Sequence, residues 1–243
     1  INQFANFYNK KELQDISIED LLGRNPIKPN LELLDKNIKN KITLITGAGG
    51  SIGSELCLNI LKRKPKKIIL FENSEYNLYK TAKLLHDYKI HNNLNVEILS
   101  VLGSIQDKSA LNRIFDHDNI DTLYHAAAYK HVPIIEDNII EGIKNNVLGT
   151  KLLIDLSIEY NVNKFVLISS DKAVRPTNYM GATKRIAEIL CLLGNKKQNK
   201  TKFCIVRFGN VLGSSGSVVP LFNQQISKGG PVTVTDSKIE RYF

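Results

Sequence analysis

The sequence predicts an α/β protein built on an open, doubly wound parallel sheet. Six short apolar runs rich in β-branched residues alternate along the chain with amphipathic segments of helical length. Strands of continuous apolar character are typical of parallel sheets covered on both faces, and the intervening helices supply the crossover connections. A third observation is a set of closely spaced glycines directly after the first run. Such sheets bind nucleotides at this position.

The predicted strands cover residues 41–46, 67–71, 95–100, 121–125, 164–168 and 203–207. The predicted helices extend from the glycines to about residue 63 and cover residues 76–88, 107–115, 138–160 and 181–193. Residues 1–40 are polar and include Pro26 and Pro29, so we expect an irregular arm or linker that packs on the domain. Residues 41–208 form the predicted nucleotide-binding domain. Residues 209–243, rich in glycine and serine, are expected to begin a smaller and incomplete substrate lobe.

The composition is that of a soluble globular chain. With 243 residues, 42% of them hydrophobic and 23% charged, the chain can bury the core of one domain. No apolar run is long enough to cross a bilayer. Because the chain starts at Ile1 instead of a methionine and stops abruptly at Phe243, we expect it to be a piece of a longer protein.

The net charge of +9 includes a basic run over residues 62–67. We interpret this run as a solvated helix end and expect no nucleic-acid partner, since no aromatic residues are interleaved with it. A basic surface would still suit an anionic substrate or an anionic membrane. The three cysteines, Cys57, Cys191 and Cys204, lie in apolar segments without metal-type spacing. Buried, reduced thiols and no metal site are therefore expected.

The glycines Gly47, Gly50 and Gly53 separate a predicted strand from a predicted helix. Glycine lets the backbone approach a pyrophosphate, whose charge is then held by amides at the helix start, here those of Ser51 and Ile52. The sequence therefore predicts a dinucleotide-binding turn.

Other candidate cofactor residues follow the next strands. Glu72 ends the second predicted strand, where a carboxylate commonly accepts hydrogen bonds from the adenosine ribose; this favours NAD over NADP, although a surface Glu would look the same. Asp107 could meet the adenine or simply cap a helix. Ala126 and Ala127 follow the fourth strand and would let a flat cofactor lie against the backbone.

Residues 167–184 form the candidate active site, on a predicted strand-loop-helix unit. Ser170, Asp171 and Lys172 end the strand, and Met180 and Lys184 lie on the helix. A solvated ion pair on a loop is the alternative for Asp171 and Lys172, but acid-base pairs at the ends of such strands are typical of active sites.

These residues lie within motifs at 46–55, 125–133, 170–178, 180–185 and 207–217. Together the motifs resemble the extended short-chain dehydrogenase/reductases. Among them the chain is similar to the polysaccharide-biosynthesis nucleoside-diphosphate-sugar 4,6-dehydratases, typified by UDP-N-acetylglucosamine 4,6-dehydratase. The resemblance runs from about Ile16 to the last residue.

The resemblance implies a lyase that uses NAD as a catalytic cofactor. Hydride leaves C4 of the sugar for NAD, water is lost across C5 and C6, and the hydride returns to C6. The expected product is a 4-keto-6-deoxy sugar nucleotide, destined for surface polysaccharide or glycan.

The resemblance also assigns roles. Asp171 and Lys172 are the acid and base, Ser170 holds the C4 oxygen, and Lys184 binds the nicotinamide ribose. Met180 stands where most of the superfamily has the Tyr base, which moves the proton chemistry onto Ser170 and Asp171, because a thioether has no proton to exchange. The membrane-associated branch of the family is similar in this respect. The residues assigned to the sugar nucleotide are Lys130, His131, Asn178, Asn210 and Arg241. A lone His such as His131 is more often structural than functional.

The expected partners are a UDP-sugar and further copies of the chain. In the longer protein we expect membrane contact only through segments absent from this chain, with the domain at the cytoplasmic face of the membrane. Two alternatives stay open: a nucleotide-sugar epimerase on the same fold, and a non-catalytic scaffold that binds NAD.

Overall fold

The computed structural model describes residues 27–198, 200–211, 218–234 and 238. Its centre is a parallel six-stranded sheet with the strand order β3-β2-β1-β4-β5-β6. The strands are β1 (Ile42–Thr46), β2 (Lys67–Glu72), β3 (Glu97–Leu102), β4 (Thr122–His125), β5 (Lys164–Ser170) and β6 (Lys202–Phe208). The order reverses between β1 and β4, and in open α/β sheets ligands bind beyond the carboxyl ends of the strands at this point.

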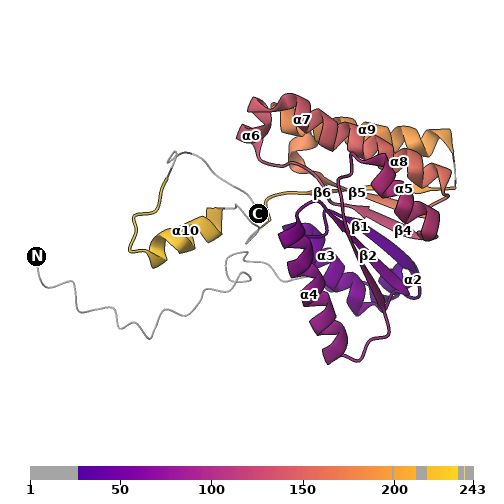
Figure 1. Cartoon of the computed structure of the whole chain (residues 1–243). Helices are drawn as coiled ribbons and strands as arrows, with labels where there is room; N and C mark the ends of the chain where they lie inside the picture. The colour runs from indigo at the N-terminus through magenta and orange to yellow at the C-terminus, as the bar shows by residue number, and fades with distance from the viewer. Residues whose placement is uncertain (1–26, 199, 212–217, 235–237, 239–243) are drawn as a thin grey trace, which may run out of the picture.

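Helices cover both faces of the sheet (Figure 1). On one face lie α2 (Leu31–Ile38), α3 (Ser51–Lys62) and α4 (Glu75–His91), packed on β1 and β2 through a core that includes Ile45, Leu61, Ile68, Leu70 and Leu85. On the other face lie α5 (Lys108–His117), α8 (Thr150–Glu159) and α9 (Tyr179–Lys197), with a core that includes Leu44, Phe71, Leu111, Leu153 and Phe165. The doubly wound fold predicted from the sequence is thus confirmed.

The predicted helix over residues 138–160 is wrong in its start and its continuity. The chain is helical from α6 (Val132–Asp137), breaks at Asn138, and resumes as α7 (Ile139–Ile143), a π-helical turn η1 (Lys144–Gly149) and α8. Asn138 leaves helical geometry at φ −134° and ψ 52°, and its side-chain amide donates to the carbonyl of Ile134. An Asn that satisfies the preceding turn in this way can end a helix where apolar periodicity alone does not.

Two further helices lie where loops were predicted. Within the 1–40 arm, α2 begins at its N-cap Asn30 and buries Ile38, so the described part of the arm packs on the domain but is not irregular. Within 209–243, α10 (Val218–Ser227) forms in what looked like a loop-rich segment. Figure 1 draws α10 apart from the helices that cover the sheet. Residues 1–26, 212–217 and 239–243 lie outside the described residues.

The amino-terminal edge of the sheet is held by ion pairs. Lys67 contacts Asp118 at 2.9 Å and Glu97 at 2.9 Å, and Lys41 contacts Asp121 at 3.3 Å. The side chain of Lys67 is only 13% exposed, so the end of the basic run is a structural ion pair instead of a solvated charge.

The three cysteines differ in burial. Cys57 and Cys191 are buried, but the expectation is wrong for Cys204, which is exposed. Cys204 belongs to β6, the edge strand of the sheet, and points to the face where Val206 is also 42% exposed.

Candidate functional site

A cavity of about 180 Å³ opens at the carboxyl ends of β1, β2 and β4, at the point where the strand order reverses. It is lined by Gly47, Gly50, Phe71, Glu72, Asn73, Asn77, Gly103, Ile105, Ala126, Ala127, Ala128, Tyr129 and Asn145. The lining includes five of the residues predicted to hold the cofactor: Gly47, Gly50, Glu72, Ala126 and Ala127.

The glycine turn is packed too closely for side chains. Gly47 has φ +67°, and a Cβ there would lie 2.6 Å from the backbone N of Ala127. A Cβ on Gly53 would lie 1.9 Å from the carbonyl oxygen of Gly47. These contacts bring the turn, the start of α3 and the segment after β4 together, so that backbone faces the cavity.

The start of α3 suits an anion. Its N-cap Gly50 offers no side-chain oxygen to the amides of the first turn, which contains Ser51, Ile52 and Gly53, and the same Gly50 lines the cavity. The backbone N–H groups of a helix start and the helix dipole together favour negative charge at this point. The residues present therefore fit the pyrophosphate of a dinucleotide.

Glu72 is held at the cavity by backbone amides. It is 7% exposed, and its carboxylate accepts hydrogen bonds from the N–H groups of Gly49 at 2.9 Å, Asn73 at 3.0 Å and Ser74 at 3.1 Å. A carboxylate fixed in this way can still accept hydrogen bonds from a ligand hydroxyl.

Asp107 is the N-cap of α5, one of the two roles that the sequence left open. Its carboxylate accepts from the hydroxyl of Ser109 at 2.7 Å and from the amide of Ala110 at 3.1 Å, and these hydrogen bonds lower its pKa. Asp107 is not among the residues that line the cavity. A contact with adenine stays a prediction.

Ser170, Asp171 and Lys172 form one hydrogen-bonded cluster where β5 ends. The Ser170 hydroxyl donates to Asp171 Oδ1 at 2.9 Å, and Lys172 Nζ contacts the same oxygen at 3.1 Å. Partial burial alone would raise the pKa of Asp171, but the hydrogen bonds from Lys172 and Ser170 prevail and lower it. Asp171 is therefore an ionised carboxylate that can accept a proton delivered through Ser170.

Lys184 lies behind this cluster on α9 and is 5% exposed. Its Nζ donates to the carbonyl of Ile168 at 2.7 Å, and burial lowers its pKa to about 8. Met180, one helical turn earlier, is 3% exposed, whereas Tyr179 is 49% exposed and its backbone N–H is bound by the carboxylate of Glu136 at 2.7 Å. The position at which most of the superfamily has a tyrosine is thus occupied here by a buried thioether.

A buried hydrogen-bond chain, not foreseen from the sequence, joins β1, β4 and α8. His125 contacts the hydroxyls of Thr46 at 2.7 Å and Thr150 at 2.8 Å. Since Thr150 gives its proton to the carbonyl of Asn146, it must accept from Nε2–H of His125, which leaves Nδ1 to accept from Thr46. Complete burial, and then the charge of Lys184, lowers the pKa of His125 to about 3, so this histidine is neutral.

Asn146 uses every hydrogen-bonding position of its side chain. Its Oδ1 accepts from the N–H of Tyr129 at 2.8 Å and from Asn145 at 3.0 Å. Its Nδ2 donates to the carbonyl of Tyr129 at 2.9 Å and to Thr183 at 3.0 Å. Asn146 therefore ties the loop at the cavity to α9 beside Lys184. Adjacent Asn residues inside a predicted helix were a signal for this contact, because Asn is a poor helix former.

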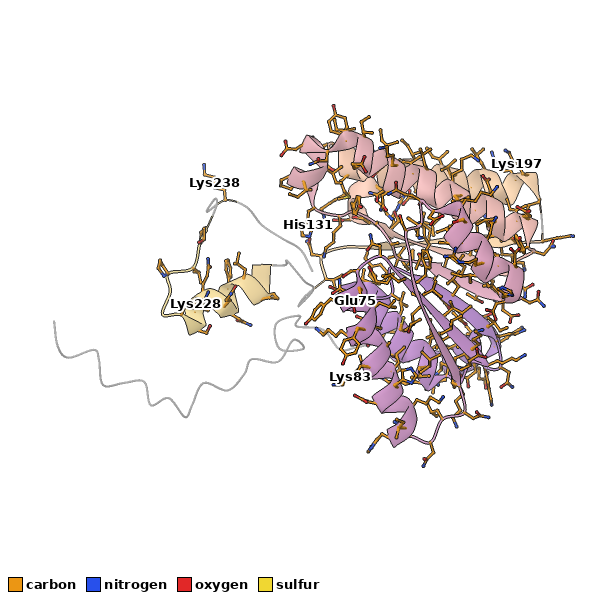
Figure 2. The ribbon with its side chains drawn as sticks, in the orientation of Figure 1. Glu75, Lys83, His131, Lys197, Lys228 and Lys238 are labelled. Carbon is orange, nitrogen blue, oxygen red and sulfur yellow. The ribbon has the colours of Figure 1, made fainter. Side chains whose placement is uncertain are left out.

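The residues assigned to the sugar nucleotide are less closely gathered. Lys130 and His131 follow the cavity loop, and both are exposed. Figure 2 shows His131 at the edge of the domain where the strands end, far from Lys197 at the other end of α9. Asn178 caps α9 by accepting from the N–H of Gly181 at 2.7 Å. Asn210 follows β6, and Arg241 lies outside the described residues.

Within the described ranges, no group of three or more His, Cys, Asp or Glu side chains could hold a metal ion, and no helix is long and apolar enough to cross a bilayer. The strand order, the glycine turn and the cavity define a Rossmann-type domain of the extended short-chain dehydrogenase/reductase class. More specifically, the polysaccharide biosynthesis protein family matches residues 43–243, and the chain belongs to this family.

Curated relatives differ in their named activities. The chain is 48% identical over 95% of its length to the capsular polysaccharide biosynthesis protein CapD of Staphylococcus aureus, of which it covers 38%. It is 36% identical to a UDP-N-acetylglucosamine 4,6-dehydratase (inverting) of Campylobacter jejuni and 32% identical to a UDP-glucose 4-epimerase of Rickettsia massiliae; each match covers 84% of the chain and 59% of the relative. The chain thus spans between about two fifths and three fifths of these relatives.

Solved structures share the fold. The structure of Pen from Bacillus thuringiensis is 39% identical with a TM-score of 0.75, over 85% of this chain and 63% of that chain. DesIV, a dTDP-glucose 4,6-dehydratase from Streptomyces venezuelae solved with NAD and TYD bound, is 21% identical with a TM-score of 0.67, over 79% of this chain and 63% of that chain.

Proposed function

We propose that this chain carries the NAD-binding and catalytic part of a nucleoside-diphosphate-sugar 4,6-dehydratase that acts on UDP-N-acetylglucosamine. The observation that carries the proposal is the Ser170–Asp171–Lys172 cluster beside buried Lys184, with Met180 in place of tyrosine. The relative from Campylobacter jejuni supports the substrate and the reaction.

The cluster supplies a route for the C4 hydroxyl proton. Ser170 can accept this proton while its own proton passes to Asp171 Oδ1, 2.9 Å away. The lowered pKa of Asp171 keeps it ready as a base at neutral pH. Asp171, once protonated, can donate to the C6 hydroxyl as water leaves. Lys172 would take the C5 proton as a neutral amine, after its ammonium has lost a proton to solvent.

Bound NAD would supply the acceptor and donor of the hydride. In this proposal Gly47, Gly50 and Gly53 would hold its pyrophosphate, and Glu72 would accept hydrogen bonds from the ribose hydroxyls of the adenosine. A buried carboxylate there would repel the additional phosphate of NADP. Lys184 would bind the nicotinamide ribose.

The test uses the full-length protein, because the chain covers 59% of the dehydratase relative. We expect incubation with UDP-N-acetylglucosamine to give a product lighter by one water. NMR in D₂O should show a ketone at C4 and deuterium at C5, and the coupling constants define the C5 configuration. A product of unchanged mass with an inverted C4 centre would show that the protein is an epimerase and not a dehydratase.

The epimerase is the second candidate, because a UDP-glucose 4-epimerase is 32% identical. Both reactions oxidise C4, but only dehydration needs an acid and a base for C6 and C5, which is the role given to Asp171 and Lys172. A non-catalytic scaffold would retain NAD binding, and neither product would form.

The longer protein is proposed to act at the cytoplasmic face of the cell membrane and to form homo-oligomers. The layout proposed for this chain is an arm over residues 1–40, the NAD-binding domain over 41–208, and the beginning of the sugar-nucleotide lobe over 209–243. The residues proposed to contact the sugar nucleotide, in that lobe and at its rim, are Asn210, Arg241, Lys130, His131 and Asn178.

A further inference from the structure

Glu188 is a buried carboxylate on α9 to which the proposed reaction gives no role. It lies one helical turn after Lys184, and its side chain is 1% exposed. An ionised group in such a place is stable only when several donors surround it.

Four donors surround Glu188. The hydroxyl of Ser169 donates to Oε1 at 2.8 Å, Arg207 donates from Nε and Nη2 to the two oxygens at 2.7 Å each, and Arg185 donates to Oε2 at 3.0 Å. Burial alone would raise the pKa of Glu188, but these hydrogen bonds hold it at about 2. The carboxylate is therefore charged throughout the physiological range.

Three residues of α9 contact the end of β5 and the residues that follow it, and Glu188 is the last of the three. Gly181 faces the carbonyl oxygen of Lys172 so closely that a Cβ would lie 2.3 Å from it. Lys184 Nζ donates to the carbonyl of Ile168, and Glu188 accepts from Ser169. Residues spaced by three and four share one face of a helix, so these contacts fix the register of α9 on the strand.

The same carboxylate reaches the neighbouring strand. Arg207 stands opposite Ser169 in the pairing of β5 with β6, and Asn210, a proposed sugar-nucleotide contact, follows three residues later. Glu188 thus joins three elements: α9 with Lys184, the strand that ends in Ser170 and Asp171, and the strand that leads to the sugar-nucleotide segment.

We infer that Glu188 is a positioning residue for the reaction, which sets Ser170 and Asp171 relative to Lys184 and to the segment after β6. The inference rests on the proposed function. It follows that loss of the Ser169–Glu188 contact slows the transfer of hydride from C4 without displacing NAD. A purely structural ion pair would lower stability and leave the rate of the folded protein unchanged.

The test is single-turnover kinetics on the full-length protein with its bound NAD. UDP-N-acetylglucosamine is mixed with excess protein, and the near-ultraviolet absorbance of reduced nicotinamide gives the rate of hydride transfer. Small misplacements of reacting groups cost up to about 100-fold in rate. We expect Ser169→Ala to slow the step about 10-fold and Glu188→Gln about 100-fold.

The matched control is Asp118→Asn at the opposite edge of the sheet. The side chain of Asp118 is 9% exposed and pairs with Lys67 at 2.9 Å, so its loss removes a comparable buried charge pair far from the cluster. Asp118→Asn should lower the thermal midpoint and leave the hydride step unchanged. Bound NAD, measured after denaturation, should be equal in all variants.

Rates equal to wild type in both Ser169→Ala and Glu188→Gln would overturn the inference. The inference would also be overturned if the rate of hydride transfer fell in proportion to the thermal midpoint in every variant, including the control Asp118→Asn. If Glu188→Gln does not fold, Ser169→Ala decides, since it leaves the Glu188–Arg207 ion pair in place. A wild type that shows neither reduced nicotinamide nor product would instead contradict the proposed function, and the inference with it.

Discussion

The half of the sheet built on β1, α3 and β2 is held together at the site by close backbone contacts, whereas the half built on β4, α8, β5 and α9 is held together by buried side-chain hydrogen bonds. In the first half, Gly47 and Gly53 leave no space for a Cβ, and Glu72, the carboxylate in the cavity lining, is held by amides. In the second half, Asn146, His125 and Lys184 are buried polar groups fixed by side-chain hydrogen bonds. The first half depends on the close approach of backbone segments, and the second depends on a hydrogen-bond partner for each buried polar atom.

This contrast predicts that the two halves fail in different ways. A substitution in the glycine turn should weaken the dinucleotide and strain the fold. A substitution in the catalytic cluster should stop the chemistry and leave the dinucleotide in place.

The largest effect is expected in the side-chain half. Asp171→Asn removes the carboxylate that receives the proton of Ser170, and it should lower the turnover number of the full-length protein by about 10²- to 10⁴-fold. NAD content and the thermal midpoint should stay close to wild type, because the Asp171 side chain is 49% exposed. Turnover by the variant at the wild-type rate would remove Asp171 from the reaction.

In the backbone half, Gly53→Ala should destabilise the protein by about 1–3 kcal/mol and weaken NAD binding, since the new Cβ would lie 1.9 Å from the Gly47 carbonyl oxygen. Calorimetric titration of NAD and thermal unfolding measure the two effects. The matched control is Gly209→Ala, where a Cβ would meet nothing within 4 Å. Equal NAD affinity in both variants would contradict the account of the turn.

The third effect concerns stability alone and involves His125, which links the two halves. Its pKa of about 3 in the folded protein lies below the ordinary histidine value of 6.5, so between these values the unfolded chain binds a proton that the native protein does not. Stability should fall with decreasing pH in this window, by about 1.4 kcal/mol per pH unit from this group. Unfolding in urea at several pH values measures the slope.

The His125→Gln variant should be less stable at neutral pH, but its stability should depend less on pH below 6.5. His86→Gln, a substitution of an exposed histidine, should keep the wild-type slope. The same slope in His125→Gln as in wild type would show that other groups carry the acid sensitivity.

The sequence was sufficient for the sheet and the glycine turn because their signals are local. Runs such as 67–71 are apolar and β-branched, and Gly47, Gly50 and Gly53 lie within one turn and one helix start. The cluster at Ser170, Asp171 and Lys172 is also contiguous, so its existence could be predicted, although the roles of its members stay proposals.

The polar network could not be predicted in the same way, because its partners are distant in the chain. Asn146 meets Tyr129 and Thr183, and Glu188 meets Ser169 and Arg207; no periodicity records such pairs. The break at Asn138 was missed for a related reason, since a side-chain hydrogen bond there ends a segment whose apolar pattern continues.

The π-helical turn at Lys144–Gly149 changes the rotational phase of the helix that contains it. Successive residues of an α-helix are about 100° apart, so one additional residue in a turn rotates everything after it by that angle. Asn145 and Asn146 lie within this turn, and both are buried. The number of residues in this segment therefore determines, as much as their identity, which side chains of α8 point into the protein. A deletion of one residue would restore regular helical winding and turn Thr150 away from His125.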